Sequence, residues 1–508
     1  MDAAPLERPF GTVSGLLQLH AAGRPAHPAI VEGERHLGYA ALDRLVDGFA
    51  AALQREGVRV GDSVALCAAN STGYAVAFLG TLRAGAAAAL IPPTLTADSI
   101  ERMVRDAGAA RLFREADLEA RALDGFIAGA RVPTPAAVTP DAPFNIIYSS
   151  GTTGEPKGIV QPCSMRWAHM QRGPAYGYAP DAVTLISTPL YSNTTLVSFF
   201  PALALGGTVV LAGKFDAGAW LALAERHRAT HAMLVPVQYQ RLMACADFDR
   251  FDLASFRMKL STSAPFAVAL KRDVLARWPG SLIEWYGMTE GGCTCVLRCN
   301  DHRDKLHTVG VPAAGVDARL IDEQGRELPR GETGEVVGRS AAMMTGYRNR
   351  PEETARAEWF DAEGRRYIRT GDVGRFDEDG FLTLLDRRKD LIISGGFNIY
   401  PSDLEAVLRT HPAVADVSVA GVPSLQWGET PVAFVVAKGA APVDAGELRK
   451  WANARLGKVQ RLEAVVLVDE LPRNAIGKVL KRELRERYAS GAESSIAKGA
   501  GTSRVSPR

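Results

Sequence analysis

The sequence predicts an α/β fold with an added β-rich module and a second, smaller domain. Apolar strand-like runs alternate with helical patterns in two rounds, one on each side of a glycine-rich stretch near residue 150. Strands that are apolar throughout and alternate with helices are typical of parallel sheets covered on both faces. Beyond about Gly310 the pattern changes to short strand-like segments separated by turn signals. A chain of 508 residues also exceeds the size of a single core, so several domains are expected.

The first round of alternation precedes the glycine-rich stretch. A helix is expected over residues 42–58, a buried strand over 63–67, a helix over 74–84 and another apolar strand over 86–91. The second round follows it, with strands over 183–186, 208–211 and 231–235 and a helix over 220–227. The two rounds predict two stacked α/β layers in one large N-terminal domain.

Residues 182–213 carry no charged side chain, a run that would suit a membrane span. Pro201 and the pair Gly206-Gly207 are expected to break this run into a helical piece and a strand. The run is therefore interpreted as buried core, and no stable membrane insertion is expected.

The second half of the large domain and the small domain are separated by a short charged run. A β-barrel-like module is expected over residues 310–385, which completes a large domain over 1–385. The run 386–390 is interpreted as a hinge, and 391–490 as a small, mobile α+β domain. Residues 491–508 are rich in Ser, Gly and Ala, and a disordered tail is expected there.

Charge and cysteine usage restrict the partners. Lys plus Arg (59) and Asp plus Glu (57) nearly cancel, which removes the electrostatic case for binding nucleic acid or an anionic membrane. Small molecules are then the expected partners, and a homodimer stays open.

Six cysteines do not make a disulfide framework in a chain of this length, and the N-terminus lacks a signal sequence, so a cytoplasmic setting is expected. Cys293, Cys295 and Cys299 lack zinc-ligand spacing and are interpreted as core residues.

The glycine-rich stretch follows a strand-like run and concentrates polar groups. Four hydroxyl residues, three glycines and one lysine lie between Ser149 and Gly158. Glycines allow the backbone to approach a polyphosphate closely, while N–H groups, hydroxyls and a lysine bind its oxygens. A Walker A loop requires Gly-Lys-Ser/Thr, whereas here Lys157 follows Pro156 and precedes Gly158. The stretch is a nucleotide loop of another kind or an ordinary Ser/Gly surface turn.

Six motifs occur in order along the chain. They are the glycine-rich Ser149–Gly158, the turn Ser263-Ala264-Pro265, Tyr286-Gly287-Met288-Thr289-Glu290, Thr370-Gly371-Asp372, Asp386-Arg387-Arg388-Lys389 and Asn474-Ala475-Ile476-Gly477-Lys478. Together they resemble one family, the adenylate-forming acyl-CoA synthetase and luciferase superfamily, over residues from about 10 to 485. The resemblance implies an enzyme that uses ATP and Mg²⁺ to activate a carboxylic acid and then passes the acyl group to CoA.

The resemblance also assigns roles to individual residues around ATP. The β- and γ-phosphates are expected to lie against Ser149, Ser150, Gly151, Thr152, Thr153, Gly154 and Lys157. The adenosine side is expected to contact Ser263, Ala264, Pro265, Glu284, Trp285, Tyr286, Gly287 and Met288, with Tyr286 stacked on adenine. Thr289 would donate near the α-phosphate, where charge builds as pyrophosphate leaves. Glu290 would bind magnesium, because carboxylates suit this hard ion.

Two further residues by resemblance form a ribose clamp, and one lysine acts from the small domain. Asp372 would accept from both ribose hydroxyls beside Arg387, although alone it is equally well a turn residue after glycine. Lys478 would approach the carboxylate and the α-phosphate, whereas a lone exposed lysine is usually only a solvated charge. Its flanking Gly477 and the family resemblance favour the catalytic role.

A second half-reaction follows from the same resemblance. In relatives the small domain rotates about a hinge between the two steps, and Lys389 matches the hinge position. Rotation would replace Lys478 by Gly395, Gly396 and Phe397, where the glycines allow a pantetheine arm to lie against backbone.

The acid pocket departs from better-known relatives. Tyr191 and Ser192 replace a Phe-His pair found in many acyl-CoA ligases, and Trp285 stands where aryl-CoA ligases often have glycine. If its indole faces the acid site, it narrows the pocket; otherwise it faces the core. Gly287 replaces a tryptophan found in short-acid synthetases, so a very small acid such as acetate is disfavoured.

The sequence therefore predicts an ATP-dependent acid–CoA ligase for a medium-sized aryl or alkyl carboxylic acid. One alternative is an adenylating enzyme that delivers the acyl group to a carrier protein, which would act in trans because the segment after Lys478 is too short for a carrier domain. The other is a non-catalytic nucleotide-binding sensor. Retention of Lys478, Glu290 and Asp372 argues against that sensor.

Overall fold

The computed structural model describes residues 4–130, 132–149, 156–387, 390–394, 397–439, 443–474 and 477–499. It divides into two compact units. The large unit comprises Met1–Arg330, Val336–Thr370 and Phe376–Thr383, and the small unit comprises Gly331–Glu335, Gly371–Arg375 and Leu384–Arg508. The α/β class with a large N-terminal and a small C-terminal part is thereby confirmed.

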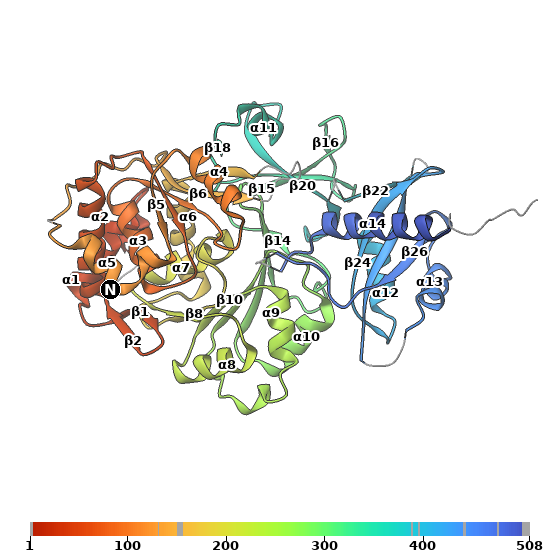
Figure 1. Ribbon diagram of the computed structural model, residues 1–508, viewed down its shortest axis with the longest axis horizontal. Coiled ribbons are helices and arrows are strands. Elements are labelled where there is room, and N and C mark those ends of the chain that lie inside the picture. Colours follow the sequence, from red (N-terminus) through yellow and green to blue (C-terminus); the bar gives the residue numbers. More distant parts are fainter. Residues whose placement is uncertain are drawn as a thin grey trace, which may run out of the picture. The chain divides into compact units, whose positions relative to one another are not determined.

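The large unit contains a nine-stranded sheet built from the second round of alternation (Figure 1). In spatial order its strands are β14 (Val311–Pro312), β13 (Thr294–Arg298), β12 (Ser281–Gly287), β11 (Met258–Ser261), β10 (His231–Leu234), β8 (Val183–Ile186), β9 (Thr208–Leu211), β1 (Pro28–Glu32) and β2 (Arg35–Gly38). The six strands from β12 to β1 are parallel to their neighbours, and the edge strands are antiparallel. Parallel strands place all their carboxyl ends at one edge of the sheet.

The first round of alternation forms a second, six-stranded sheet. Its order is β18 (Gly346–Tyr347), β7 (Lys157–Pro162), β6 (Pro143–Ser149), β4 (Ala87–Leu90), β3 (Ser63–Cys67) and β5 (Ala109–Arg114). Strands β6, β4, β3 and β5 are parallel, while β7 returns antiparallel beside β6. The glycine-rich stretch is therefore the connection of the β6–β7 hairpin.

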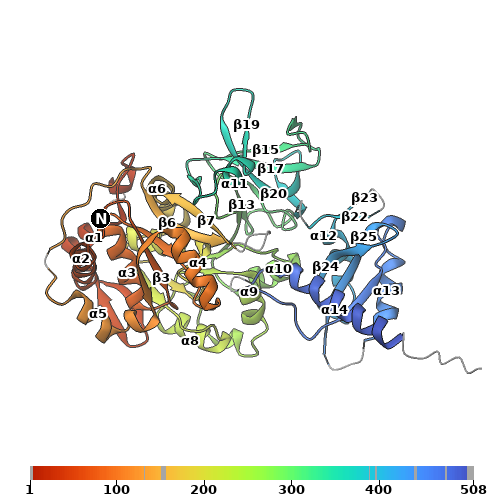
Figure 2. The ribbon, with the colours of Figure 1, turned by 45° about the horizontal axis from the view of Figure 1, so that its top comes forward.

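Helices fill the space between these two sheets. One continuous apolar cluster includes side chains from both sheets, such as Ile30 and Leu66, together with α1 (Val13–Gly23), α2 (Tyr39–Arg55), α3 (Thr72–Arg83) and α7 (Asn193–Ala204). Figures 1 and 2 both show α1, α2 and α3 gathered at the N-terminal end of the large unit. The remaining helices of this unit are α4 (Ala97–Ala107), α5 (Ala120–Ile127), α6 (Cys163–Gln171), α8 (Ala217–Arg226), α9 (Pro236–Met243), α10 (Val268–Arg277) and α11 (Pro351–Arg356).

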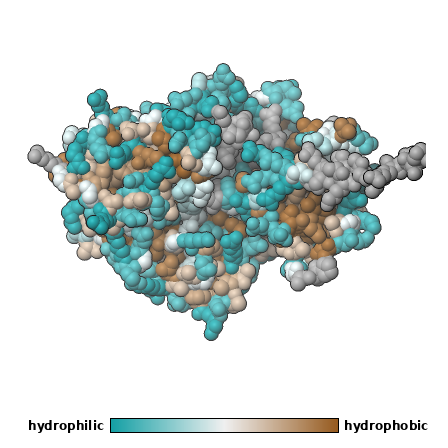
Figure 3. Space-filling model, in the orientation of Figure 1, coloured by the Kyte–Doolittle hydropathy of each residue, from teal (hydrophilic) through white to brown (hydrophobic). Residues whose placement is uncertain are grey.

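The uncharged run divides into a helix, α7, and a strand, β9, as predicted. Pro201 takes no part in this division, because it lies inside α7, which continues to Ala204. The neighbouring Phe199 and Phe200 are fully buried, so apolar packing maintains the helix where a proline removes a backbone hydrogen bond. Among the described residues no helix is long and apolar enough to cross a membrane. The face in Figure 3 mixes hydrophilic and hydrophobic residues, with hydrophilic ones over much of it.

The β-rich module is a third sheet. Its order is β16 (Glu327–Leu328), β15 (Asp317–Ile321), β17 (Gly334–Arg339), β20 (Arg366–Phe376) and β19 (Glu358–Phe360), and β21 (Leu382–Arg387) also pairs with β20. Figure 2 shows β15, β17, β19 and β20 together. Among the described residues this sheet is the β-rich module that the sequence predicts.

The small unit is a sheet with helices on both faces. Its strands are β23 (Phe397–Ile399), β22 (Ile392–Ser394), β25 (Gly428–Ala437), β24 (Val414–Ser424) and β26 (Ala464–Leu467). Ala433 and Val435 pack with α12 (Pro401–Arg409) and α13 (Ala445–Asn453), whereas Val432 and Phe434 pack with α14 (Lys481–Gly499). Alternate residues of β25 therefore pack in two separate cores, one on each face of the sheet. Helix α14 is assigned over Lys481–Gly499, and the disorder expected from residue 491 stays a prediction.

Candidate active site

Three of the predicted motifs follow parallel strands of the nine-stranded sheet at the same edge. Residues 189–192 come after β8, residues 263–265 come after β11, and residues 287–290 lie at the end of β12. In open α/β sheets, ligands bind outside the carboxyl ends of the strands. The topology therefore brings the expected adenosine, magnesium and acid-pocket residues to one edge.

A strained residue connects two of these motifs. Ser263 has a φ of 81°, a left-handed conformation that is uncommon for a residue with a side chain. Its hydroxyl lies 2.6 Å from the Thr194 hydroxyl in the first turn of α7, just after Tyr191 and Ser192. Backbone strain of this kind persists only where the surroundings hold it, and it concentrates at functional sites. The expected adenosine-side turn is thus fixed against the expected acid pocket.

Glu290 and Lys157 are joined by a residue that the sequence did not indicate. The Tyr347 hydroxyl donates to the Glu290 carboxylate at 2.8 Å, and the Lys157 ammonium lies 5.2 Å from the centre of the Tyr347 ring. Tyr347 reaches this place because β18 pairs with β7, which sets Tyr347 opposite Ile159. Burial, and then the neighbouring Glu290 carboxylate, raise the pKa of Tyr347, so its hydroxyl stays a donor. Nothing in the sequence pattern around a single tyrosine could have identified it.

The Glu290 site fits a magnesium ion. The carboxylate is half-buried, and a backbone bond from Met344 N to the Glu290 carbonyl, 2.8 Å long, holds its main chain. Within the described chain no three His, Cys, Asp or Glu side chains cluster as a metal site. One carboxylate is nevertheless a usual protein contribution to Mg²⁺, whose remaining ligands are phosphates and water.

Glu284, expected on the adenosine side, has a side chain that pairs within the protein. Its side chain is buried and forms an ion pair with Lys271 of α10, whose ammonium also donates to the Leu306 carbonyl at 2.7 Å. Leu282, two residues earlier on β12, packs with the same helix-covered core. The period of two in a strand thus turns this carboxylate toward α10, and contact of Glu284 with adenosine stays a prediction.

Trp285 faces the opposite side of β12. Like Ile283, it belongs to the apolar cluster between the two large sheets, and its ring lies 4.8 Å from the Tyr176 ring in an edge-to-face contact. Tyr191 borders the same cluster. The two residues expected to shape the acid pocket therefore lie at the rim of one apolar region, and both are half-buried.

The remaining predicted residues of the large unit differ in how far they are buried. Tyr286 is buried, Gly287 is exposed, Met288 and Thr289 are half-buried, and Ser263 and Ala264 are half-buried beside the exposed Pro265. Ser149 ends β6, and its side chain lies outside the described part of the chain, as do residues 150–155. Contacts of the glycine-rich loop with phosphate remain a prediction.

The small unit holds the other predicted residues. Asp372 is buried on β20, and Phe397 on β23 exposes 56% of its surface opposite Ser394. Arg387 ends β21 with its side chain outside the described part, and Lys389, Gly395 and Gly396 also lie outside it.

Lys478 is held at the end of a tight turn. The Asn474 side-chain oxygen accepts from the Lys478 backbone N–H at 2.9 Å, and the Lys478 carbonyl accepts from Asn474 N at 3.0 Å. Gly477 has a φ of 75°, which glycine adopts without strain. The glycine beside the predicted catalytic lysine therefore has a conformational reason to be there.

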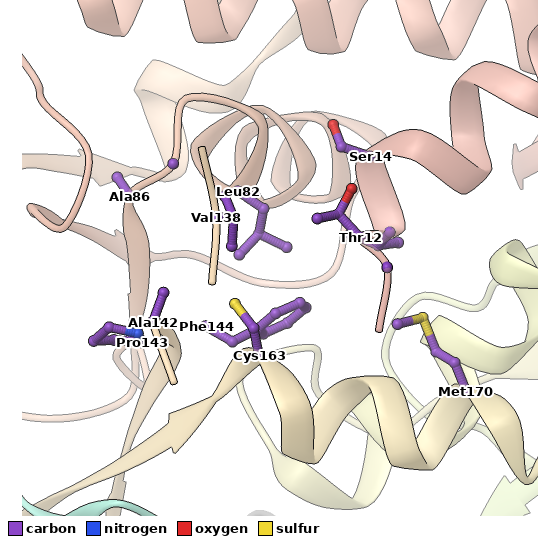
Figure 4. A pocket seen from close by; sticks show the side chains of 13 residues that line it. Thr12, Ser14, Leu82, Ala86, Val138, Ala142, Pro143, Phe144, Cys163 and Met170 are labelled. Carbon is purple, nitrogen blue, oxygen red and sulfur yellow. The ribbon is translucent and has the colours of Figure 1, made fainter. Parts of the chain in front are cut away.

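A pocket elsewhere in the large unit does not involve the predicted residues (Figure 4). It is lined by Leu82, Phe144, Met170, the Cys163 thiol and the hydroxyls of Thr12 and Ser14, among others. The Thr12 hydroxyl already accepts from Gly15 N, and the Ser14 hydroxyl from Arg83. Burial raises the pKa of Cys163 to about 12, so this thiol stays protonated at neutral pH. Such an apolar lining suits neither a polyphosphate nor a carboxylate.

Comparison with known proteins identifies the family. Residues 17–348 match the model of the AMP-binding enzyme family, and residues 403–478 match that of the AMP-binding enzyme C-terminal domain. The chain belongs to the AMP-binding enzymes. The predicted superfamily and the predicted class of AMP-forming ligase are thereby confirmed, as is the family's use of ATP, Mg²⁺ and CoA.

Similar proteins differ in the acid and in the acceptor. The chain is 34% identical to a feruloyl-CoA synthase of an Amycolatopsis species over 91% of this chain and 96% of the relative. It is 31% identical to 4-coumarate–CoA ligase 3 of Oryza sativa subsp. japonica (94% and 92% covered) and 31% identical to the fatty acid–[acyl-carrier-protein] ligase ScoC of Streptomyces coeruleorubidus (92% and 95%).

Solved structures show the same fold. The amide bond synthetase McbA from Marinactinospora thermotolerans has a TM-score of 0.83 and 31% identity, with 94% of this chain and 99% of that chain covered. The o-succinylbenzoate CoA synthetase MenE from Bacillus subtilis, in complex with ATP and a magnesium ion, has a TM-score of 0.81 and 28% identity (92% and 98% covered).

Proposed function

We propose that the chain is an ATP-dependent acid–CoA ligase for a medium-sized aryl or alkyl carboxylic acid. The observation that carries this proposal is the position of Tyr191 and Trp285 at the rim of one apolar cluster, beside the edge where the nucleotide motifs gather. An apolar wall favours an acid with a ring or a short alkyl body. Relatives that act on ferulate and 4-coumarate support the aryl acid.

In the proposed first step, a carboxylate oxygen of the acid attacks the α-phosphorus of ATP, and pyrophosphate leaves. Lys157 and the glycine-rich loop would bind the leaving phosphates, and Thr289 would donate to the charge that develops at the α-phosphoryl. Glu290 would hold Mg²⁺, which supplies positive charge to the phosphates. Tyr347 would hold Glu290 in place. Lys478 would neutralise charge between the carboxylate and the α-phosphate.

In the proposed second step, the CoA thiolate attacks the acyl carbon of the mixed anhydride, and AMP leaves with the shared oxygen. Residues 386–390 would act as the hinge between the domain 1–385 and the domain 391–490, with Lys389 as the pivot. The exposed Phe397 would meet the pantetheine arm together with Gly395 and Gly396. Asp372 and Arg387 would hold the ribose.

Pyrophosphate release across a panel of acids, with and without CoA, tests this proposal. Acid-dependent release and a CoA thioester, highest for aryl or medium alkyl acids, are expected. Absence of acid-dependent release would refute the proposal that the chain activates a carboxylic acid. Release without a thioester favours the second candidate, transfer to a carrier protein in trans, for which the similarity to ScoC is the specific support.

Lys478→Ala tests the division of labour between the steps. Adenylation is expected to fall strongly, while thioesterification of a supplied acyl-adenylate is largely retained, because the lysine would act only at the carboxylate and α-phosphate. Equal loss in both steps would contradict this division.

A further inference from the structure

A buried polar cluster in the large unit connects three of the motifs. Asn145 on β6, Gln161 on β7 and Arg166 on α6 are all 0% exposed. Asn145 and Gln161 are paired across the β6–β7 hairpin, whose connection is the glycine-rich loop. Polar groups at this depth require hydrogen-bond partners, so each buried side-chain atom can be assigned as a donor or an acceptor.

Gln161 is the centre of this cluster. Its side-chain oxygen accepts from the Arg166 guanidinium and from the Asn145 amide at 2.9 Å. Its amide nitrogen donates to the Thr289 carbonyl at 2.6 Å and to the Asn193 side-chain oxygen at 3.3 Å. Arg166 also donates to the Asn145 oxygen at 3.0 Å, which closes a triangle of three side chains.

Arg166 determines which end of the Gln161 amide faces which partner. A guanidinium has donors only, so the oxygen of Gln161 must face Arg166, and its NH₂ group must face Thr289 and Asn193. Burial lowers the pKa of Arg166 to about 9, which leaves it charged at neutral pH. No carboxylate in the described part of the chain pairs with it; its other contact is His169 at 3.4 Å.

Stability alone does not account for such a cluster. A buried charge bonded only to neutral groups is costly, and replacing buried ionic groups by well-packed apolar side chains often stabilises a protein. What the cluster provides is fixed geometry. The Thr289 carbonyl lies beyond the end of β12 at Gly287, and Asn193 begins α7 directly after Tyr191 and Ser192.

We propose that Gln161, oriented by Arg166 and Asn145, is a positioning residue that fixes Thr289 and Asn193 relative to the hairpin of the glycine-rich loop. This rests on the proposed function. One amide thereby sets the place of the Thr289 hydroxyl, of the adjacent Glu290 carboxylate and of the acid-pocket segment against the strands that carry Lys157. Adenylation needs these groups in register, because displacement by about 1 Å can cost roughly 100-fold in rate.

Gln161→Glu separates positioning from stability. The carboxylate keeps the shape of the amide and its bonds from Arg166 and Asn145, and it gains an ion pair. Its second oxygen would face the Thr289 carbonyl oxygen across the present 2.6 Å contact, which opposes that gain, so the melting temperature is measured together with the rates. It cannot donate to Thr289 or Asn193. The expected result is a loss of about 10- to 100-fold in kcat for acid-dependent pyrophosphate release, with a much smaller change in KM for ATP. The matched control is Gln54→Glu, a half-buried amide that bonds both backbone groups of Thr134 at the surface.

The outcomes distinguish the two proposals. Wild-type release with unchanged kcat in Gln161→Glu overturns the inference and leaves the proposed function standing. No acid-dependent release from the wild type overturns the proposed function and the inference with it. If Gln161→Glu does not fold, Gln161→Met, which is apolar and of similar length, carries the same test. If neither variant folds, the residue is structural and the inference is overturned.

Discussion

Removing one hydroxyl group tests the link between Tyr347 and Glu290. Tyr347→Phe deletes the donor that lies 2.8 Å from the Glu290 carboxylate, while the ring 5.2 Å from the Lys157 ammonium is kept. The variant therefore isolates the hydrogen bond from the cation–ring contact.

The expected magnitude follows from the charge of the acceptor. A hydrogen bond to a charged group contributes about 1.5–3 kcal/mol. If Glu290 holds magnesium only when it is oriented by Tyr347, this energy is lost in the transition state. Because 1.36 kcal/mol corresponds to a factor of ten in rate, kcat/KM for pyrophosphate release should fall by roughly 10- to 150-fold.

The assay is pyrophosphate release as a function of Mg²⁺ concentration. The Tyr347→Phe enzyme should need more Mg²⁺ for half-maximal rate. Tyr367→Phe is the matched control, since the Tyr367 hydroxyl bonds Asp317 at 2.5 Å in the β-rich module and touches none of the predicted site residues. The control should change stability without changing the Mg²⁺ requirement. Equal Mg²⁺ dependence in wild type and Tyr347→Phe would refute the reasoning.

Three other changes have expected outcomes. Lys271→Met leaves the buried Glu284 carboxylate unpaired and should lower the free energy of unfolding by about 3–5 kcal/mol in denaturant titrations. The double variant Lys271→Met with Glu284→Gln should recover most of this free energy. No recovery would contradict the pairing of the two side chains. Burial lowers the pKa of His231 to about 4, below its ordinary value of about 6.5 in the unfolded chain. As the pH falls from 7 to 5, the unfolded chain therefore binds a proton at this residue and the folded protein does not. The free energy of unfolding should fall by about 2 kcal/mol over that range. Unfolding of His231→Gln should be less sensitive to pH over the same range, and an unchanged slope would count against this assignment. Trp285→Ala removes the ring beside Tyr176 and should raise kcat/KM for bulkier acids relative to smaller ones, whereas an unaltered acid preference would exclude Trp285 from the pocket wall.

The strands were predictable because their apolar runs are short and bounded. β3, β8 and β9 begin and end at the predicted residues; β3 and β9 are buried along their whole length, and β8 is buried except at Val183. Pro201 was misjudged because local propensity argued for a break, while burial of the surrounding α7 residues decided the outcome.

The candidate site was predictable only where a motif is continuous in the sequence. Tyr347, Gln161 and Arg166 carry no local signal, and their relation to Glu290 or Thr289 depends on the pairing of β18 with β7 and of β7 with β6. The true partner of Glu284 is likewise set by α10 packing on β12, not by its neighbours in the motif. Contacts between residues far apart in the chain follow from sheet order, which a single sequence does not specify.

The central claim is that a carboxylate oxygen attacks the α-phosphorus of ATP. An acid labelled in its carboxylate with a heavy oxygen isotope, turned over with ATP and CoA, tests this directly by mass spectrometry of the products. We expect AMP that carries one labelled oxygen, together with an acyl-CoA thioester and unlabelled pyrophosphate. AMP without label, or label in inorganic phosphate, would contradict it.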